Sequence, residues 1–344
     1  MKNDSDDFCR KDVFSLMDKK LWRLYFKTLL FTLMGLCGVL AILYGIFMYM
    51  VGGLNRQSVD EGSLSVNENL SVYGNQGIMN IAFYGIDSQD EGNKGRSDAI
   101  LIASVNGKTG KIKLISIARD TYVDVPDHGK TKINHAYAYG GPELAIQTIN
   151  ENFHLDIKDY VSVNFDSLAD VIDELGGVDL EVSEAERKQI NNYLLKGEKL
   201  QESGQVHLTG PQAVSYSRIR KIDGDVMRGE RQRKVLECLF KKALEINPLA
   251  YPSYVRKFAP MVETSLSNDE ILKIASVGMK SGVSLDQAGL PNEYIKAGGQ
   301  TIKGVWYYVY DIEQAADMIE DFIYHDIPFD QYGKDMAEET DTTE

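Results

Sequence analysis

An uncharged apolar segment near the N-terminus constrains this chain more than any other feature. No charged residue stands between Lys27 and Arg56, and most positions from 28 to 51 are apolar. Since a helix needs about 20 apolar residues to cross a bilayer, we expect one transmembrane helix over residues 28–51. A cleaved signal peptide would have a shorter apolar region, about 7–15 residues, and then a small-residue cleavage site. The sequence Met-Val-Gly-Gly at residues 50–53 does not supply that site.

The charges that flank this segment predict its orientation. Four bases precede it: Lys19, Lys20, Arg23 and Lys27. On the other side Arg56 is followed by acidic residues. The positive-inside rule therefore places residues 1–27 in the cytoplasm and the rest of the chain outside, as a single-pass protein of the cell membrane.

Composition divides the remaining chain into three parts. Residues 52–76 are rich in Gly, Ser and Asn and lack apolar periodicity, which predicts a tether. A globular domain is expected over residues 77–328. The acidic end, residues 329–344, is typical of a solvated tail.

The overall charge and the metal-binding residue types exclude several classes of protein. The net charge, 37 − 51 = −14, argues against a nonspecific nucleic-acid binder or an anionic-membrane binder, because both work through broad basic surfaces. The three cysteines, Cys9, Cys37 and Cys238, lie far apart, and the five histidines show no ligand spacing. Neither a disulfide framework nor a structural zinc site is expected.

Apolar patterns within the domain predict an α/β fold. Strands are expected over residues 78–85, 99–105, 111–117 and 160–165. Helices are expected over residues 142–153, 166–175, 228–244 and 311–324. Asp166 is the predicted cap of the second helix, and Gly176-Gly177 is its predicted end.

Basic residues are concentrated in one short part of this acidic chain. The members of this cluster are Arg218, Arg220, Lys221, Arg228, Arg231, Arg233 and Lys234. Arg228 and Arg231 would lie in the first turn of the predicted helix, where the macrodipole disfavours cations unless an anion is bound there. Gln232 follows Arg228 at helical spacing. The plainer interpretation of the cluster is a solvated face whose bases pair with neighbouring acids.

Acidic residues stand at the ends of the predicted strands. Asp87 ends the first strand and Asp98 begins the second, and together they could hold one Mg²⁺ through one or two carboxylates. Arg119 and Asp120 end the third strand, where a simple ion pair or turn is the alternative. Since the planar guanidinium matches phosphate oxygens two at a time, the acids and arginines together predict a site for a magnesium pyrophosphate.

Eight short motifs follow one another along the domain: GID (85–87), GRSDAI (95–100), SIARDT (116–121), KINHAYAYGG (132–141), VNF (163–165), ELGGVDLEV (174–182), SYSRIR (215–220) and RGERQRK (228–234). Their order resembles that of the LytR-CpsA-Psr family of cell-envelope proteins. The later stretch GVWYYVYD (304–311) resembles the C-terminal end of the family. The family often has an arginine two positions after the first acid, where this chain has Gln89.

The resemblance implies a fold and an activity. The fold would be a single α/β/α domain with a central mixed sheet behind one membrane helix. The activity would be that of a Gram-positive phosphotransferase, which moves a glycopolymer such as teichoic acid or capsule from polyprenyl pyrophosphate to peptidoglycan. Mg²⁺ is the expected cofactor, with Mn²⁺ as the alternative. The expected partners are the lipid-linked glycopolymer, peptidoglycan and the bilayer, and no nucleic acid.

The resemblance also assigns roles to individual residues. Asp87 and Asp98 would be catalytic acids that also hold the magnesium ion. Arg119 would be a third catalytic residue. The implied pyrophosphate-binding residues are Arg96, Arg119, Lys132, Arg218, Arg220, Arg228 and Gln232, with Arg231 as a weaker candidate. Asp87 could be a general base for the acceptor hydroxyl, a metal ligand, or both.

Two other classes of function remain open. One is a hydrolase that cleaves polyprenyl pyrophosphate with the same acids and arginines and uses water as the acceptor. The other is a noncatalytic regulator or scaffold bound to the membrane. A regulator would not need Asp87, Asp98 and the arginines together.

Overall fold

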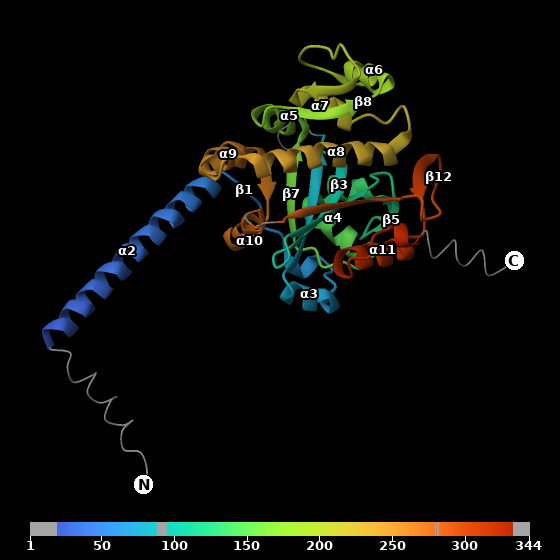
Figure 1. Ribbon diagram of the computed structural model, residues 1–344. Coiled ribbons are helices and arrows are strands. Elements are labelled where there is room, and N and C mark those ends of the chain that lie inside the picture. Colours follow the sequence, from blue (N-terminus) through green and yellow to red (C-terminus); the bar gives the residue numbers. More distant parts are fainter. Residues whose placement is uncertain (1–18, 88–94, 279, 281, 333–344) are drawn as a thin grey trace, which may run out of the picture.

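A seven-stranded mixed sheet forms the centre of the molecule, and one long helix leaves it at the N-terminal side (Figure 1). The computed structural model describes residues 19–87, 95–278, 280 and 282–332. Cys9, Gln89 and most of the predicted acidic tail therefore lie outside the described residues. The long helix is α2 (Lys19–Val51), and its residues from Trp22 onward are apolar enough to cross a membrane.

The sheet combines parallel and antiparallel pairs. In spatial order its strands are β1 (Asn55–Arg56), β10 (Val262–Thr264), β7 (Asp159–Asn164), β2 (Ile78–Ile86), β3 (Ser97–Asn106), β4 (Lys111–Ile117) and β11 (Ser284–Leu290). β2, β3 and β4 are antiparallel neighbours, whereas β7 joins β2 and β11 joins β4 in parallel. The four central strands were predicted to within two residues at each end.

Helices cover both faces of the sheet, because β3 carries apolar side chains on both. Ile100 and Ile102 are buried on the face covered by α4 (Ile133–Phe153) and α11 (Ile312–Tyr324). Leu101 and Ala103 point to the opposite face, where they pack with Leu236 of α8 (Gly224–Glu245). The expected α/β/α arrangement with a central mixed sheet is confirmed.

A smaller lobe with its own apolar core lies next to α8 (Figure 1). Its elements are α5 (Phe165–Glu174), β8 (Val178–Val182), α6 (Glu184–Tyr193), β9 (Gly204–Leu208) and α7 (Gly210–Ser217). α5 ends before Gly176-Gly177 as predicted, and both glycines have positive φ. The cap of α5 is Asn164 and not Asp166, because the Asn164 side chain accepts a hydrogen bond from the Ser167 amide.

The remaining elements lie around the edges of the sheet. They are α3 (Ser71–Asn75), β5 (Tyr122–Val125), β6 (Gly129–Lys132), α9 (Tyr251–Phe258), α10 (Asn268–Gly278), β12 (Gly298–Ile302) and β13 (Val305–Val309). α4 begins well before its predicted start, because residues 133–140 are also helical; the two parts are separated by Gly141 at φ 72°. Pro142 then begins the second part, a position where its missing N–H costs no hydrogen bond.

Residues 52–76 do not form the predicted tether. β1 lies in this segment and pairs with β10, where Asn55 stands opposite Glu263. Leu64 is fully buried in the core of the main domain, and Leu70 is also buried, at 4% exposed. The burial of such apolar side chains stabilises a fold by about 1.5–3 kcal/mol each, so the segment is part of the domain.

Candidate functional site

A pocket of about 450 Å³ opens where β2 and β4 end and β3 begins. We call it the polar pocket. It is lined by Asp87, Arg96, Asp98, Arg119, Phe165, Tyr193, Arg218, Arg220, Lys221, Arg228 and Gln232. The structure thus brings together all of the predicted site residues except Lys132 and Arg231.

The antiparallel pairing of β2 with β3 places the two acids. The register of the pair shifts after Gly85, and the amide of Asp87 donates to the carbonyl of Arg96 at 3.3 Å. Glycine is required at position 85, because a Cβ would lie 2.9 Å from the Cβ of Ala99. The end of one strand and the start of the next therefore present Asp87 and Asp98 to the same pocket.

Each of these acids is paired with an arginine. Arg119 contacts Asp98 through a short ion pair, and Arg218 lies 3.4 Å from Asp87. The guanidinium of Arg218 also lies over the ring of Phe165, 5.2 Å from its centroid, which fixes its plane. The pocket thus holds acids and bases whose charges partly neutralise one another.

A layer of buried charges forms part of the pocket wall and continues behind it. Arg228 and Asp225 are both about 6% exposed and approach to 2.7 Å, although the contact is not aligned as a hydrogen bond. Burial lowers the pKa of Arg228 and raises that of Asp225. Burial alone would lower the pKa of Arg119, but the neighbouring Asp98, Asp120 and Asp225 raise it above its usual value. This guanidinium therefore stays charged.

Two arginine donors of this layer have no acceptor within the described chain. They are the Nε–H groups of Arg119 and Arg228, both of which are buried. An unpaired buried donor costs about 1–3 kcal/mol. Such strain is typical of sites prepared for a charged ligand.

Lys132 lies beside the polar pocket instead of in its wall. Its ammonium contacts Asp120 at 2.9 Å and lies 6.0 Å from the ring centroid of Tyr307. Burial, Arg96 and Lys132 together lower the pKa of His135, so this ring lies within the field of the same bases. Lys132 therefore contributes positive charge next to the pocket through its pair with Asp120 and does not line the pocket.

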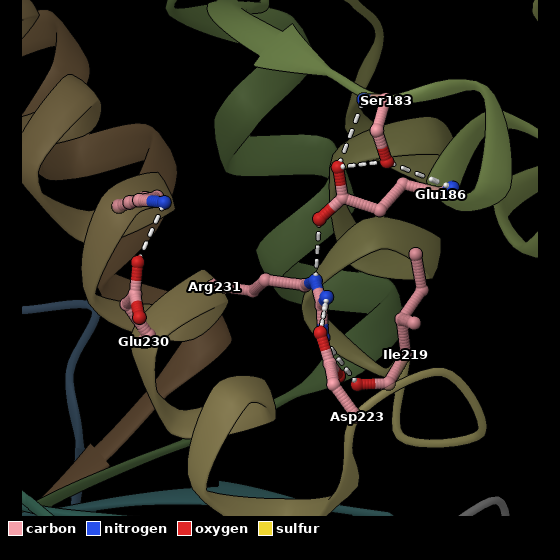
Figure 2. A network of polar contacts seen from close by, with 7 residues as sticks. Ser183, Glu186, Ile219, Asp223, Glu230 and Arg231 are labelled. Carbon is pink, nitrogen blue, oxygen red and sulfur yellow. Dashed lines mark hydrogen bonds and ion pairs between the residues drawn. The ribbon is translucent and has the colours of Figure 1, made fainter.

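The Arg231 side chain forms ion pairs within the protein, so its prediction as a pyrophosphate ligand is corrected. Figure 2 shows its guanidinium between Glu186 and Asp223. It donates to Glu186 at 2.8 Å and to the carbonyl of Ile219 at 3.2 Å, and its side chain is 5% exposed. Glu186 also completes a capping box with Ser183 at the start of α6, so Arg231 joins α8 to the smaller lobe.

The error about Arg231 has a local cause. The helix was expected to begin at Arg228, but α8 begins at Gly224. Arg228 and Arg231 therefore lie beyond the first turn, which instead holds the acidic Asp225. The two arginines face different surroundings and do not share one anion.

Three residues of the pocket wall were not in the predicted set. Phe165 stands in the VNF motif, and Lys221 in the basic cluster, so both had a sequence signal. Tyr193 had none, because it comes from the end of α6, far from the other wall residues in the sequence. The Lys221 ammonium lies 5.7 Å from its ring centroid.

An apolar cavity adjoins the polar pocket. It shares Phe165 and Gln232 with that pocket, and its volume is about 70 Å³. The other lining residues are Phe83, Tyr84, Gly85, Ala99, Leu101, Val163, Leu168, Ser217, Val235 and Leu236. The cavity lies between the sheet, α5 and α8, and in this structure the side chains nearly fill it.

These features define a class of protein: an α/β domain with a pocket of acids and arginines beside an apolar cavity, behind one apolar helix of membrane-spanning length. Residues 48–322 match the LytR_cpsA_psr family. This chain belongs to the LytR-CpsA-Psr family.

Individual relatives cover most of the domain. The chain is 32% identical over 272 residues to the polyisoprenyl-teichoic acid–peptidoglycan teichoic acid transferase TagU of Oceanobacillus iheyensis, covering 76% of this chain and 79% of the relative. It resembles TagT bound to LIIa-WTA with a TM-score of 0.60 and 27% identity, over 72% of this chain and 91% of the other. It also resembles YwtF (TagT) with bound octaprenyl pyrophosphate lipid, with a TM-score of 0.56 and 25% identity, over 73% and 91%.

Proposed function

We propose that this chain is a membrane-anchored phosphotransferase that moves a glycopolymer from a polyprenyl-pyrophosphate carrier to a peptidoglycan sugar hydroxyl during cell-wall assembly. The observation that carries the proposal is the contact between the polar pocket and the apolar cavity, which share Phe165 and Gln232. A polyprenyl pyrophosphate has the same two parts, a charged head and an apolar chain. The names of the relatives support a teichoic acid as the polymer.

The arginines of the pocket suit phosphoryl transfer. Such a reaction depends mainly on positioning and on neutralising charge spread over phosphate oxygens. Arg96, Arg119, Arg218 and Arg220 would hold the pyrophosphate, while the more deeply buried Arg228 would add positive charge from the pocket wall. The acceptor oxygen bonds to the phosphorus on the polymer side, and the bond to the bridging oxygen breaks. Polyprenyl phosphate leaves, and the hydroxyl proton passes to Asp87 if that acid is the base.

The two strand-end acids fit a magnesium ion. Mg²⁺ binds proteins through one or two carboxylates and completes its shell with water and phosphate oxygens. Asp87 and Asp98 supply that number, and the described residues offer no cluster of three or more acids, histidines or cysteines. The ion, with Mn²⁺ as the alternative, would neutralise pyrophosphate charge when bound, and Asp87 and Asp98 would exchange their arginine partners for it.

The proposal includes an orientation for α2. The bases before the helix support a cytoplasmic N-terminus, and therefore a catalytic domain on the outer face of the cell membrane. That location brings the pocket to the side where peptidoglycan lies, as expected for a Gram-positive envelope.

The test uses the purified full-length chain with a lipid-linked teichoic acid precursor, Mg²⁺ and peptidoglycan. We expect polyprenyl phosphate and polymer-bound peptidoglycan in equal amounts, and no release when peptidoglycan is omitted. Release of polyprenyl phosphate without peptidoglycan would instead establish a hydrolase. No turnover of any lipid-linked polymer, together with unchanged cell walls in a deletion strain, would favour the noncatalytic regulator.

A further inference from the structure

The end of α2 packs against the domain through α9. From Trp22 to Tyr49 every side chain of α2 is exposed except Phe47, and Val51 is again buried. The Arg256 guanidinium of α9 lies 5.0 Å from the Tyr49 ring centroid and contacts the Tyr49 carbonyl at 3.4 Å. Figure 1 shows α2 leaving the domain as an isolated rod whose end meets α9.

The length of α2 fixes the depth of this contact. Twenty helical residues rise about 30 Å, which is the thickness of the hydrocarbon layer. Counted from Lys27, the last charged residue before the apolar segment, that length ends at Phe47. Tyr49 lies just beyond this point, so its partner Arg256 sits at the level of the lipid headgroups.

α9 has the composition of an interfacial helix. None of its residues is buried, and two of its apolar residues, Tyr254 and Phe258, lie one turn apart with ring centroids 5.9 Å from each other. Arg256 and Lys257 stand in its last turn. Just before it, Leu249 is 89% exposed, a costly arrangement for a leucine in water.

α9 is also joined to the helices that wall the apolar cavity. Lys257 forms an ion pair with Glu174 at the end of α5. The hydroxyl of Tyr251 donates to the carbonyl of Ala243 in α8 at 3.0 Å. The position of α9 therefore sets the position of α5 and α8 relative to the bilayer.

We infer that Leu249 and α9 form a lipid-binding surface that rests in the headgroup layer of the membrane crossed by α2. Leu249 inserts toward the acyl chains and Arg256 lies among the lipid phosphates, while Lys257 keeps its ion pair with Glu174. The occupant is a phospholipid surface, because this surface continues directly from a membrane helix. The inference rests on the proposed span, and it adds that the domain lies on the bilayer, with the α5 and α8 ends toward it.

The test measures membrane depth in the full-length chain, placed one copy per lipid nanodisc. Single cysteines carry an environment-sensitive fluorophore, and lipids with nitroxide quenchers at shallow or deep positions report contact. The first variant retains the native Cys37 in the middle of α2, with Cys9 and Cys238 changed to Ser. The others lack all native cysteines and carry Leu249→Cys or the control Leu195→Cys; Leu195 is also a strongly exposed leucine, 79%, in the smaller lobe.

We expect the deep quencher to reduce the fluorescence of the label at Cys37. The shallow quencher should reduce the fluorescence at position 249 by at least twofold, and neither quencher should affect the label at position 195. Quenching at Cys37 with equal, low values at positions 249 and 195 would overturn the lipid surface while leaving the span intact. It would point to a protein partner or a second copy of the chain instead. Absence of quenching at Cys37 would overturn the span and the surface together.

Discussion

The Arg218 guanidinium lies 3.4 Å from the Asp87 carboxylate, and this pair joins the smaller lobe to the end of β2 across the polar pocket. Both side chains are partly exposed, 34% and 40%, so the pair can separate. A magnesium pyrophosphate offers a cation to Asp87 and an anion to Arg218 at once. Magnesium alone would pair with Asp87 and leave Arg218 without a counter-charge, and pyrophosphate alone would do the reverse.

The first prediction concerns the two acids. Asp87→Asn and Asp98→Asn should each lower magnesium-dependent transfer by at least 100-fold, since the metal loses one of its few protein ligands. Asp87→Asn should also strengthen metal-free binding of inorganic pyrophosphate, because Arg218 is no longer paired. Turnover and isothermal titration with EDTA measure the two effects. Full transfer by the double variant would remove both acids from the mechanism.

The second prediction separates a binding site from a solvated basic face. Arg218→Lys keeps the charge but loses the planar two-point contact and the position over Phe165, so transfer should fall about tenfold or more. Arg220→Ala should also impair it. Lys234→Ala is the control, because Lys234 is exposed and pairs with Glu230, one turn away on the same helix. If the three variants are as active as the parent chain, the arginines do not hold the substrate.

The structure also changes the choice of control for that experiment. From the sequence alone Arg233→Ala would be the natural silent variant. Arg233, however, is packed against Ser116, and a Cβ at Gly289 would lie only 2.5 Å from its guanidinium. Burial lowers the pKa of Arg233, so its removal would disturb packing as well as charge.

The third prediction concerns Arg231, which supports the fold and not the substrate. Arg231→Ala leaves the partly buried Glu186 and the carbonyl of Ile219 without their donor, and the loss of hydrogen bonds that involve a charged group typically costs about 1.5–3 kcal/mol. Urea unfolding of the full chain should show this loss, with KM for the lipid-linked donor unchanged in the folded fraction. A stable Arg231→Ala variant with a raised KM would return Arg231 to the binding site.

The fourth prediction is a pH dependence of stability at Asp159. Burial, reinforced by Glu270 and Glu61, raises the pKa of Asp159 to about 6. The folded chain therefore holds a proton between about pH 4 and 6 that the unfolded chain releases, and its stability falls as pH rises through this window. Asp159→Asn keeps an acceptor for the Ser265 hydroxyl and should remove the effect. The gain in Tm over the parent chain should grow from pH 4 to pH 6 and then level off; a constant difference would contradict the shifted pKa.

The fifth prediction tests the orientation of α2. A membrane-impermeant thiol reagent added to intact cells should not label Cys9, while external protease should remove the domain that follows α2. The bases before the helix are the reason. Permeabilised cells, in which Cys9 becomes accessible, are the control. Labelling of Cys9 in intact cells would reverse the orientation.

Local patterns predicted the parts of the fold that depend on near neighbours. β4 was predicted without error, because its apolar residues and the turn that precedes it lie within one short stretch of sequence. In that turn, at residues 106–110, the Asn106 side chain accepts hydrogen bonds from the amides of Lys108 and Thr109. The strand-end acids and most pocket arginines were found for the same reason, since each stands in a local motif at the end of an element.

Long-range contacts account for what the sequence did not predict. Residues 52–76 look like a linker because Leu64 and Leu70 are isolated among polar residues, and nothing local shows that they are buried. The same holds for Arg231, whose partner Glu186 belongs to a different helix of the smaller lobe. Charge and spacing identify a cluster of bases, but only the folded chain shows which of them already has an acid.

The pairing of β1 with β10 also limits how far the pocket can move away from the end of α2. β1 begins almost directly after α2 ends at Val51, so no slack chain separates the anchor from the sheet. A flexible linker of about 25 residues would let a domain wander about 25–30 Å from its anchor. With α2 across the membrane as proposed, a domain held this way would move only by diffusing in the plane of the membrane and rotating about α2. The pocket would then stay at one height above the lipid, and the distance between membrane and cell wall would limit which peptidoglycan strands can receive polymer.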